Sequence, residues 1–166
     1  MNKIGLIAGS FDPITNGHTW LIKQALTLVD VLYVVIGNNP AKRYMFSEQE
    51  RTNLVKAVCE DAGVYDRIVV QSTSTEMLVN VAFNLNVDFL IRGIRNASDF
   101  EYESQMLLIN RSIQPSINTV FLIPPRELTE VSSSTVKSLV GFTSWGGVVT
   151  NYVSPCVLTA LQEKVK

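Results

Sequence analysis

A short polar segment with two glycines and the chain's only histidine follows the first apolar run. From Gly9 to His18 it reads Gly-Ser-Phe-Asp-Pro-Ile-Thr-Asn-Gly-His. Gly9 and Gly17 carry no side chain, so backbone there can come close to a ligand, and Asp12-Pro13 is a turn sequence. His18 opens the expected next helix, where unpaired amides and the helix dipole favour anions. The segment therefore predicts a phosphate site with an imidazole beside it.

Three other segments carry groups that could meet phosphates. Lys42 lies in a polar loop after the second apolar run, and Arg92 and Arg95 flank Gly93 after the fourth. Two guanidinium groups beside a buried strand are costly unless they meet anions. Three serines, 132–134, begin a helix after the fifth run, and their hydroxyls with the free amides would form an anion nest.

Each of these groups also has a purely structural interpretation. A lone histidine is usually a surface residue or a satisfied core residue, and Lys42 and Arg43 could be solvated loop charges. The serines could be no more than a helix cap. The two arginines could form ion pairs with acidic residues of the following segment, namely Asp99, Glu101 or Glu103. By default, Tyr102, Leu107 and Leu108 are core or subunit contacts.

The elements that must position these groups alternate between apolar runs and helix-like segments. This alternation predicts a parallel sheet with right-handed crossovers. We expect strands over residues 4–8, 31–36, 67–71, 89–91 and 119–122. The fold class is α/β: a single-domain, Rossmann-like, doubly wound sheet of about five parallel strands with helices on both faces, covering 1–166. No linker or repeat interrupts the order.

Helices are expected between these strands. The first covers about residues 18–28, and a capping box, Ser47-x-x-Glu50, opens a second that reaches about Asp61. The others cover residues 76–85, a long segment capped by Ser98 or Asp99 and ending near Arg111, a short segment after Val131, and a C-terminal segment that starts at Pro155. The loop over residues 37–40 should be mobile.

All the suspected binding groups follow the carboxyl ends of predicted strands. Open parallel sheets bind ligands at that edge, where the strand order reverses. We therefore expect four separate segments to converge on one site. The fingerprint Gly-x-Gly-x-x-Gly is missing after the first strand, which argues against an NAD-dependent oxidoreductase.

The composition narrows the partners and the location. A net charge of −1 gives no positive field for a nucleic-acid polymer, so a small phosphorylated ligand is favoured. No apolar run reaches the roughly 18 residues of a membrane span, and the first residues show no signal-peptide pattern. We expect a cytoplasmic protein without membrane association. Cys59 and Cys156 have no metal-ligand spacing and are expected to be free, buried thiols.

The sequence resembles the nucleotidylyltransferase superfamily through its Thr-x-Gly-His ending, and the decapeptide resembles the phosphopantetheine adenylyltransferases in particular. Four further motifs stand in the order that this family shows and extend over nearly the whole chain. They are Pro40-x-Lys42-x-x-Met45-Phe46, Ile-Arg-Gly-Ile-Arg at 91–95, Asp-Phe-Glu-Tyr-Glu at 99–103 and Val-Ser-Ser-Ser-Thr-Val-Lys at 131–137.

The resemblance implies transfer of the adenylyl group of ATP to 4′-phosphopantetheine, giving dephospho-coenzyme A and pyrophosphate in coenzyme A biosynthesis. The substrate phosphate would attack the α-phosphorus in line, so alignment and charge stabilisation would suffice. By carry-over, Ser10 would orient the attacking phosphate and Lys42 would hold it. His18 would stabilise the α-phosphate oxygens.

The same resemblance implies two sets of binding residues. Phosphopantetheine would contact Ser10, Lys42, Leu78 and Arg92. ATP would contact Ser10, Phe11, His18, Gly93, Ile94, Arg95, Glu103, Leu128, Thr129, Glu130, Val131, Ser132, Ser133 and Ser134. Mg²⁺ would screen the phosphates, held mainly by nucleotide and water, because no carboxylate cluster is evident. The family also implies a homohexamer and possible feedback by coenzyme A.

Three positions depart from the usual family pattern. Ser10 stands where many members have threonine, Val131 where isoleucine is common, and Leu128 where some members have an aromatic residue. Two alternatives stay open at this point. Another small nucleotidylyltransferase would share Thr-x-Gly-His and the serine helix, and a non-catalytic nucleotide sensor would keep the serines and arginines. A structural assembly protein would not need converging phosphate groups.

Overall fold

The fold is built on one parallel sheet. A computed structural model describes residues 2–73 and 76–166. Met1, one of the first residues in which no signal-peptide pattern was found, lies outside the described residues. The strands are β1 (Ile4–Gly9), β2 (Val31–Gly37), β3 (Ile68–Thr73), β4 (Phe89–Gly93) and β5 (Asn118–Leu122). Each lies within two residues of its predicted bounds, and all pairs are parallel. The predicted α/β fold is confirmed; the extent of the domain, 1–166, stays a prediction.

The strand order explains where a ligand can bind. The order is β3-β2-β1-β4-β5, so the chain first moves outward from β1 and then crosses back to β4. β1 pairs with β2 through Ile7 and Val34, and with β4 through Leu6 and Leu90. The reversal therefore lies between β1 and β4, and the loops after these two strands separate there to leave a crevice.

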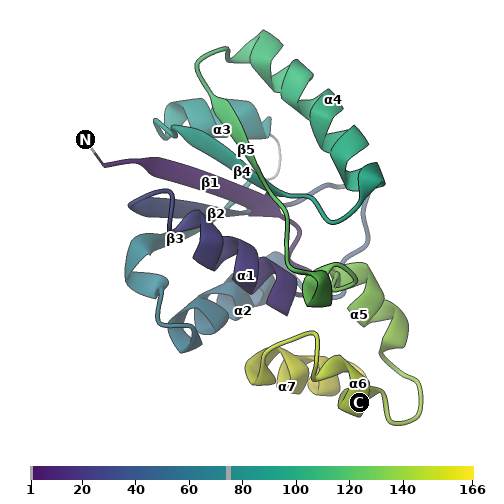
Figure 1. Cartoon of the computed structure of the whole chain (residues 1–166). Helices are drawn as coiled ribbons and strands as arrows, with labels where there is room; N and C mark the ends of the chain where they lie inside the picture. The colour runs from purple at the N-terminus through teal and green to yellow at the C-terminus, as the bar shows by residue number, and fades with distance from the viewer. Residues whose placement is uncertain (1, 74–75) are drawn as a thin grey trace.

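Helices cover both faces of the sheet (Figure 1). They are α1 (Asn16–Ala25), α2 (Glu48–Asp61), α3 (Leu78–Asn84), α4 (Ala97–Ile113), α5 (Ser133–Leu139), α6 (Trp145–Val149) and α7 (Pro155–Lys164), with single 3-10 turns η1 (Tyr65–Arg67) and η2 (Arg126–Leu128). Helices α1 and α2 lie on one face, and α3 and α4 on the other. The C-terminal helices α6 and α7 extend the first layer beneath α2.

Each face has its own hydrophobic core. One cluster joins α1, α2 and α7 to the sheet, with Ile22, Val55 and Leu161 fully buried. The other joins α3 to the opposite face, with Val79 packed among residues such as Leu90. Both faces of β1 are therefore covered, which is why its sequence is a continuous apolar run rather than an alternating one.

Helices α1 and α4 differ from the prediction at their ends, and α3 begins at Leu78 rather than at residue 76. Helix α1 starts at Asn16 rather than His18, because Thr15 is the capping residue. It ends at Ala25 rather than residue 28, since the amides of Thr27 and Leu28 bond to carbonyls only three residues back. Helix α4 is capped by Asn96 rather than Ser98 or Asp99, since the Asn96 side chain accepts a hydrogen bond from the Asp99 amide at 2.9 Å. The sequence did not predict α6, a single short helix.

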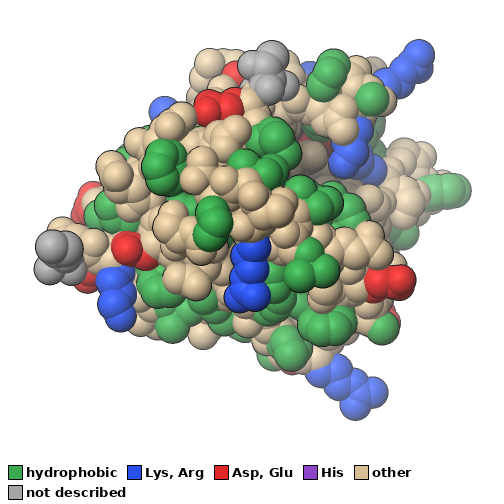
Figure 2. Space-filling view, turned by 90° about the horizontal axis from the view of Figure 1, so that it is seen from above, with side chains coloured by type: hydrophobic (Ala, Val, Ile, Leu, Met, Phe, Trp, Pro, Cys, Tyr) green, Lys and Arg blue, Asp and Glu red, His purple; other side chains and the backbone are tan. Residues whose placement is uncertain are grey.

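The surface over α3 and α4 carries scattered hydrophobic side chains (Figure 2). Helix α4 has 17 residues, yet among them only Glu103 is buried, with 9% of its surface exposed. Tyr102 and Leu108 are 60% and 67% exposed, so they do not belong to the core.

Two further expectations concern the cysteines and membrane-spanning helices. Cys59 and Cys156 are free as expected, and burial raises the pKa of the Cys59 thiol to about 11, but Cys156 is only half-buried. Within residues 2–73 and 76–166, no helix is long and apolar enough to cross a membrane.

Candidate active site

Two adjoining cavities open at the carboxyl edge of the sheet. The first has a volume of about 520 Å³ and the second about 430 Å³. The first lies among the Gly9–His18 segment, the Lys42 loop, the end of β4 and the start of α5. The second lies against α3 and α4. The residues common to both are Ala8, Gly9, Ser10, Tyr44, Arg92 and Glu103. The predicted convergence of four segments is therefore present.

The segment after β1 turns sharply before it enters α1. Phe11 has a φ of 47°, in the left-handed region, and its side chain is 1% exposed. A Cβ added at Gly17 would lie 3.2 Å from the carbonyl oxygen of Val131. Glycine at this position therefore lets the start of α1 approach the backbone that precedes α5. This contact brings together two segments that are predicted to bind phosphate.

His18 is held in one tautomer by the cap of its own helix. The Thr15 amide donates to His18 Nδ1 at 3.1 Å, and the Thr15 hydroxyl lies 2.9 Å from the same atom. Because Nδ1 accepts from an amide, the ring proton of the neutral form is on Nε2. Burial, with Arg95 and Arg92 nearby, lowers the pKa of His18 to about 4. His18 is thus a neutral hydrogen-bond donor at neutral pH, lining the first cavity.

Asp12 joins three segments of the site. Its carboxylate, 1% exposed, accepts hydrogen bonds from the amides of Met45 and Phe46 at 2.9–3.1 Å and pairs with Lys137 Nζ at 2.9 Å. From the sequence, Asp12 was interpreted only as a turn residue, and Lys137 had no expected role. The turn interpretation was incomplete, because the same carboxylate fixes the loop after Lys42 and one side of α5.

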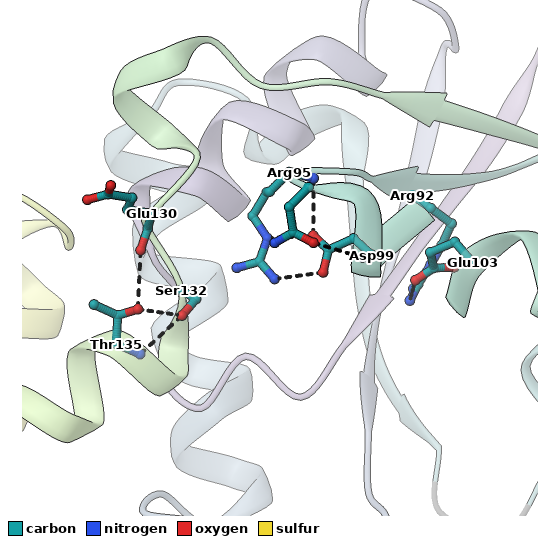
Figure 3. A network of polar contacts seen from close by, with 8 residues as sticks. Arg92, Arg95, Asp99, Glu103, Glu130, Ser132 and Thr135 are labelled. Atoms are coloured by element: carbon teal, nitrogen blue, oxygen red, sulfur yellow. Dashed lines mark hydrogen bonds and ion pairs between the residues drawn. The ribbon is translucent and has the colours of Figure 1, made fainter. Parts of the chain in front are cut away.

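Both predicted phosphate-binding arginines have carboxylate partners (Figure 3). Arg92 forms two hydrogen bonds with Glu103, at 2.6 and 2.9 Å, and donates to the Ala8 carbonyl at 2.7 Å. Arg95 pairs with Asp99 at 2.9 Å. Burial raises the pKa of Asp99, but the hydrogen bonds and charge of Arg95 outweigh it and hold the pKa below its usual value.

These pairs agree with the structural alternative for the arginines, but they do not remove them from the site. The Arg92 and Arg95 side chains are 26% and 34% exposed, and both line the first cavity. The carboxylates set the direction of each guanidinium group while part of it stays accessible. The ion pairs are therefore compatible with anion binding at the remaining N–H groups.

The serine segment is a helix cap and a cavity wall at the same time. Ser132 caps α5 by accepting from the Thr135 amide at 3.0 Å, as Figure 3 shows. The Ser133 hydroxyl donates to the Pro13 carbonyl at 2.8 Å. The expectation of three hydroxyls shared by one anion nest therefore needs correction, because two of them already have protein partners. All three serines nevertheless line the first cavity.

Most of the predicted site residues line the cavities. Those at the first cavity are Ser10, Phe11, His18, Lys42, Arg92, Gly93, Arg95, Glu103, Leu128, Val131, Ser132, Ser133 and Ser134. Leu78 lines the second cavity, with Ser10 and Arg92. Ile94, Thr129 and Glu130 line neither: the Ile94 side chain is buried, and the Thr129 hydroxyl is bound to the Arg126 carbonyl.

Other cavity residues were not predicted. Trp20 and Leu21 reach the first cavity from α1, and Tyr44 lies where the two cavities meet. Tyr44 is two residues from Lys42 in the same polar loop, which is the signal that could have indicated it. Trp20 and Leu21 carried no signal besides the helical pattern that also places residues in the core.

The carboxylates of the first cavity already have cationic partners: Asp12 with Lys137, Asp99 with Arg95, and Glu103 with Arg92. In the part of the chain that the structure describes, no group of three or more histidine, cysteine or acidic residues could hold a metal ion. A metal ion at this site would therefore take most of its ligands from a bound nucleotide and from water.

Comparisons with known proteins agree with this arrangement. The family model described as cytidylyltransferase-like matches residues 6–139. A phosphopantetheine adenylyltransferase of Chromobacterium violaceum is 44% identical over 91% of this chain and 90% of its own length. That of Lactobacillus gasseri is 41% identical over 97% of this chain and 93% of its own length.

The solved structures show the same fold at much lower identity. Plasmodium falciparum nicotinic acid mononucleotide adenylyltransferase complexed with NaAD has a TM-score of 0.77 at 15% identity and covers 98% of this chain and 96% of its own. Together with the cavity at the strand reversal, the neutral histidine after Gly17 and the sequence relatives, this fold identifies the chain as a member of the cytidylyltransferase-like family and, within it, of the phosphopantetheine adenylyltransferases.

Proposed function

We propose that this protein transfers the adenylyl group of ATP to 4′-phosphopantetheine, forming dephospho-coenzyme A and pyrophosphate in coenzyme A biosynthesis. Membership of the phosphopantetheine adenylyltransferases supports the reaction. The observation that carries it is a pair of adjoining cavities that share Ser10 and Arg92. Two substrates that react through their phosphates need two binding cavities, and these cavities must adjoin at the place where the phosphates react.

The two cavities suit different ligands. The first has His18, Arg95 and the serine segment, which fit the phosphates of ATP. The second has apolar side chains from α3 and α4, including Leu78, Met106 and Leu107, which fit the pantetheine arm. In this assignment, the attacking phosphate lies at the shared residues, between Ser10 and Arg92.

The chemistry follows from charge and alignment. An oxygen of the substrate phosphate attacks the α-phosphorus of ATP, and the bond from that phosphorus to the β-phosphate oxygen breaks, releasing pyrophosphate. The nucleophile is already an anion, so no protein base is needed. The neutral His18 donates its Nε2 proton as a hydrogen bond to the α-phosphate oxygens as charge builds there. Lys42 neutralises the approaching phosphate.

Mg²⁺ would screen the nucleotide phosphates and lower the cost of bringing two anions together. The protein's own part is to orient the phosphates through Ser10, Arg92 and Arg95 and to keep them at the strand reversal. The paired carboxylates Glu103 and Asp99 fix the direction of these arginines.

The proposal extends to assembly, regulation and location. Helix α4 exposes Phe100, Tyr102 and Leu108, and a 17-residue helix with so little buried surface suits the subunit contacts of a homohexamer. Coenzyme A contains the pantetheine arm and would compete for the second cavity as a feedback inhibitor. The reaction would take place in the cytoplasm.

The test is a substrate comparison. Purified protein with ATP and Mg²⁺ is given 4′-phosphopantetheine, nicotinamide mononucleotide or glycerol 3-phosphate, and pyrophosphate release is measured together with product mass. We expect dephospho-coenzyme A from the first substrate and no product from the others. A product from nicotinamide mononucleotide alone would assign the chain to a different transferase. ATP binding without any turnover would indicate a nucleotide sensor.

A further inference from the structure

Arg51 of α2 is the largest side chain that is almost completely buried, with 1% of its surface exposed. Its guanidinium group lines neither cavity but contacts Ser10 and Tyr44, which line both. One nitrogen, Nη1, donates to the carbonyls of Ser10 at 2.7 Å and Gly37 at 3.2 Å, and the other, Nη2, donates to the Asn38 side chain. The central carbon of the group, Cζ, lies 4.1 Å from the centre of the Tyr44 ring.

This buried charge has no anionic partner. Among residues 2–73 and 76–166, no carboxylate forms an ion pair with Arg51, and its buried Nε has no hydrogen-bond partner. The Glu48 carboxylate is linked to it through the amide of Asn38, which contacts both. A buried charge without a counter-charge is destabilising, so the fold keeps Arg51 at a considerable cost to stability.

A second arginine shows that anchoring the backbone does not require this burial. Arg67 also donates to three main-chain carbonyls, those of Leu26, Val29 and Asp30, at the opposite edge of the sheet. It does so as an exposed residue, where water offsets the charge. The two arginines thus make similar contacts with the backbone, but Arg51 is buried and Arg67 is exposed to water.

The residues that Arg51 contacts explain why it is buried while Arg67 is exposed. Ser10 and Tyr44 line both cavities, and Asn38 lines the second. Lys42 lies between Asn38 and Tyr44 in the same loop. The guanidinium group therefore connects the residue expected to orient the attacking phosphate with the loop that carries the expected catalytic lysine. Its positive charge acts toward the junction, where an anionic phosphate would supply the missing negative charge.

We propose that Arg51 is a positioning residue for adenylyl transfer, acting through the Ser10 carbonyl and the 38–44 loop, and that the substrate phosphate is its missing counter-charge. This inference rests on the proposed function for its kinetic part. Its electrostatic part is independent, because the charge would favour any small phosphate anion at the junction.

The first test separates charge from geometry with Arg51→Met and Arg51→Lys, and with Arg67→Met and Arg67→Lys as matched controls. We expect Arg51→Met to lower kcat about tenfold or more and to raise KM for phosphopantetheine more than KM for ATP. It should also abolish most of the rise in thermal midpoint that inorganic phosphate causes. Arg51→Lys should recover that rise but only part of kcat, because one ammonium group cannot reach three acceptors. The Arg67 variants should lower only the midpoint.

The second test leaves Arg51 in place. The double variant Asn38→Asp with Glu48→Gln keeps the total charge and a hydrogen bond between positions 38 and 48, now donated from position 48, but moves a carboxylate next to the guanidinium group. We expect its free form to be at least as stable as Glu48→Gln alone, while the midpoint shift with inorganic phosphate falls severalfold and KM for phosphopantetheine rises.

The outcomes distinguish this inference from the proposed function. If wild-type protein forms no dephospho-coenzyme A, the proposed function fails, but the phosphate-dependent midpoint still tests Arg51. The inference is overturned if Arg51→Met behaves like Arg67→Met, losing stability while kcat and the phosphate shift stay normal. If Arg51→Met and Arg51→Lys do not fold, an unchanged phosphate shift in the double variant overturns it.

Discussion

The two edges of the sheet use the same kinds of polar residue in opposite ways. At the amino edge, Asp30 accepts from the Lys3 amide and Asp88 from the Ile4 amide, both at 2.8 Å, and Arg67 donates to backbone carbonyls. These groups complete the hydrogen bonds of strand ends and turns. At the carboxyl edge, Arg92 and Arg95 are also paired, yet they line a cavity.

The difference lies in the direction of the chain. Every strand of a parallel sheet delivers its following loop to the carboxyl edge, and the helices that begin there point their free amides at the same place. The strand reversal between β1 and β4 leaves room for a ligand at that edge. Substitutions at the amino edge should therefore cost stability, and substitutions at the carboxyl edge should cost activity.

The largest effect should come from His18→Ala. Its Nε2 donor meets charge that develops in the transition state, so we expect kcat to fall about 100-fold or more with a smaller change in ATP binding. Asp88→Asn is the matched change at the amino edge and should leave kcat unaltered. Steady-state kinetics on both variants decide the point, and near wild-type turnover by His18→Ala would remove the histidine from the mechanism.

Lys42→Met should have the next largest effect. The exposed lysine lies on the loop after β2, and loss of one charge-assisted contact to phosphate should lower kcat/KM roughly 30-fold. The thermal midpoint of the free protein should hardly change, because an exposed charge contributes little stability. Lys42→Arg should restore part of the rate. A variant that unfolds many degrees earlier but keeps its activity would make Lys42 structural.

A matched pair of arginines tests the division between the two cavities. Arg92 lines both and Arg95 only the first. We expect Arg92→Ala to weaken phosphopantetheine about tenfold and ATP less, and Arg95→Ala to do the reverse. Titration calorimetry with each ligand separates the two. Equal weakening of both ligands by both variants would reduce the two sites to one general basic patch.

The smallest effect should be in the pH dependence of stability. The pKa of His18 is lowered from 6.5 to about 4 in the folded protein, so the unfolded chain takes up its proton first as the pH falls. His18 therefore contributes stability above pH 6.5 that is lost between pH 6.5 and 4. Wild type should lose on the order of 1 kcal/mol more than His18→Gln by pH 5. Parallel denaturation curves for the two proteins at every pH would contradict the burial of a neutral imidazole.

Much of the fold was accessible from local pattern. The apolar runs gave every strand, and Ser47 with Glu50 correctly marked the start of α2. The helix boundaries that were missed depended on caps: Thr15 and Asn96 could be recognised only from the hydrogen bonds that they make. The family motifs located most of the lining of the first cavity, while Ile94, Thr129 and Glu130, expected from the same resemblance, line neither cavity.

The sequence by itself determined the α/β alternation, the loop before His18 that is expected to bind phosphate, and the family, because these depend on residue type and spacing along the chain. The tertiary structure alone decided which charges are satisfied. Nothing in the sequence sets Arg51 apart from its neighbours in α2, and Asp12 is typical of a turn. Folding brings Arg51 to the Ser10 carbonyl and Asp12 to Lys137. Burial and pairing are properties of neighbours that are distant in the chain, so no local pattern can reveal them.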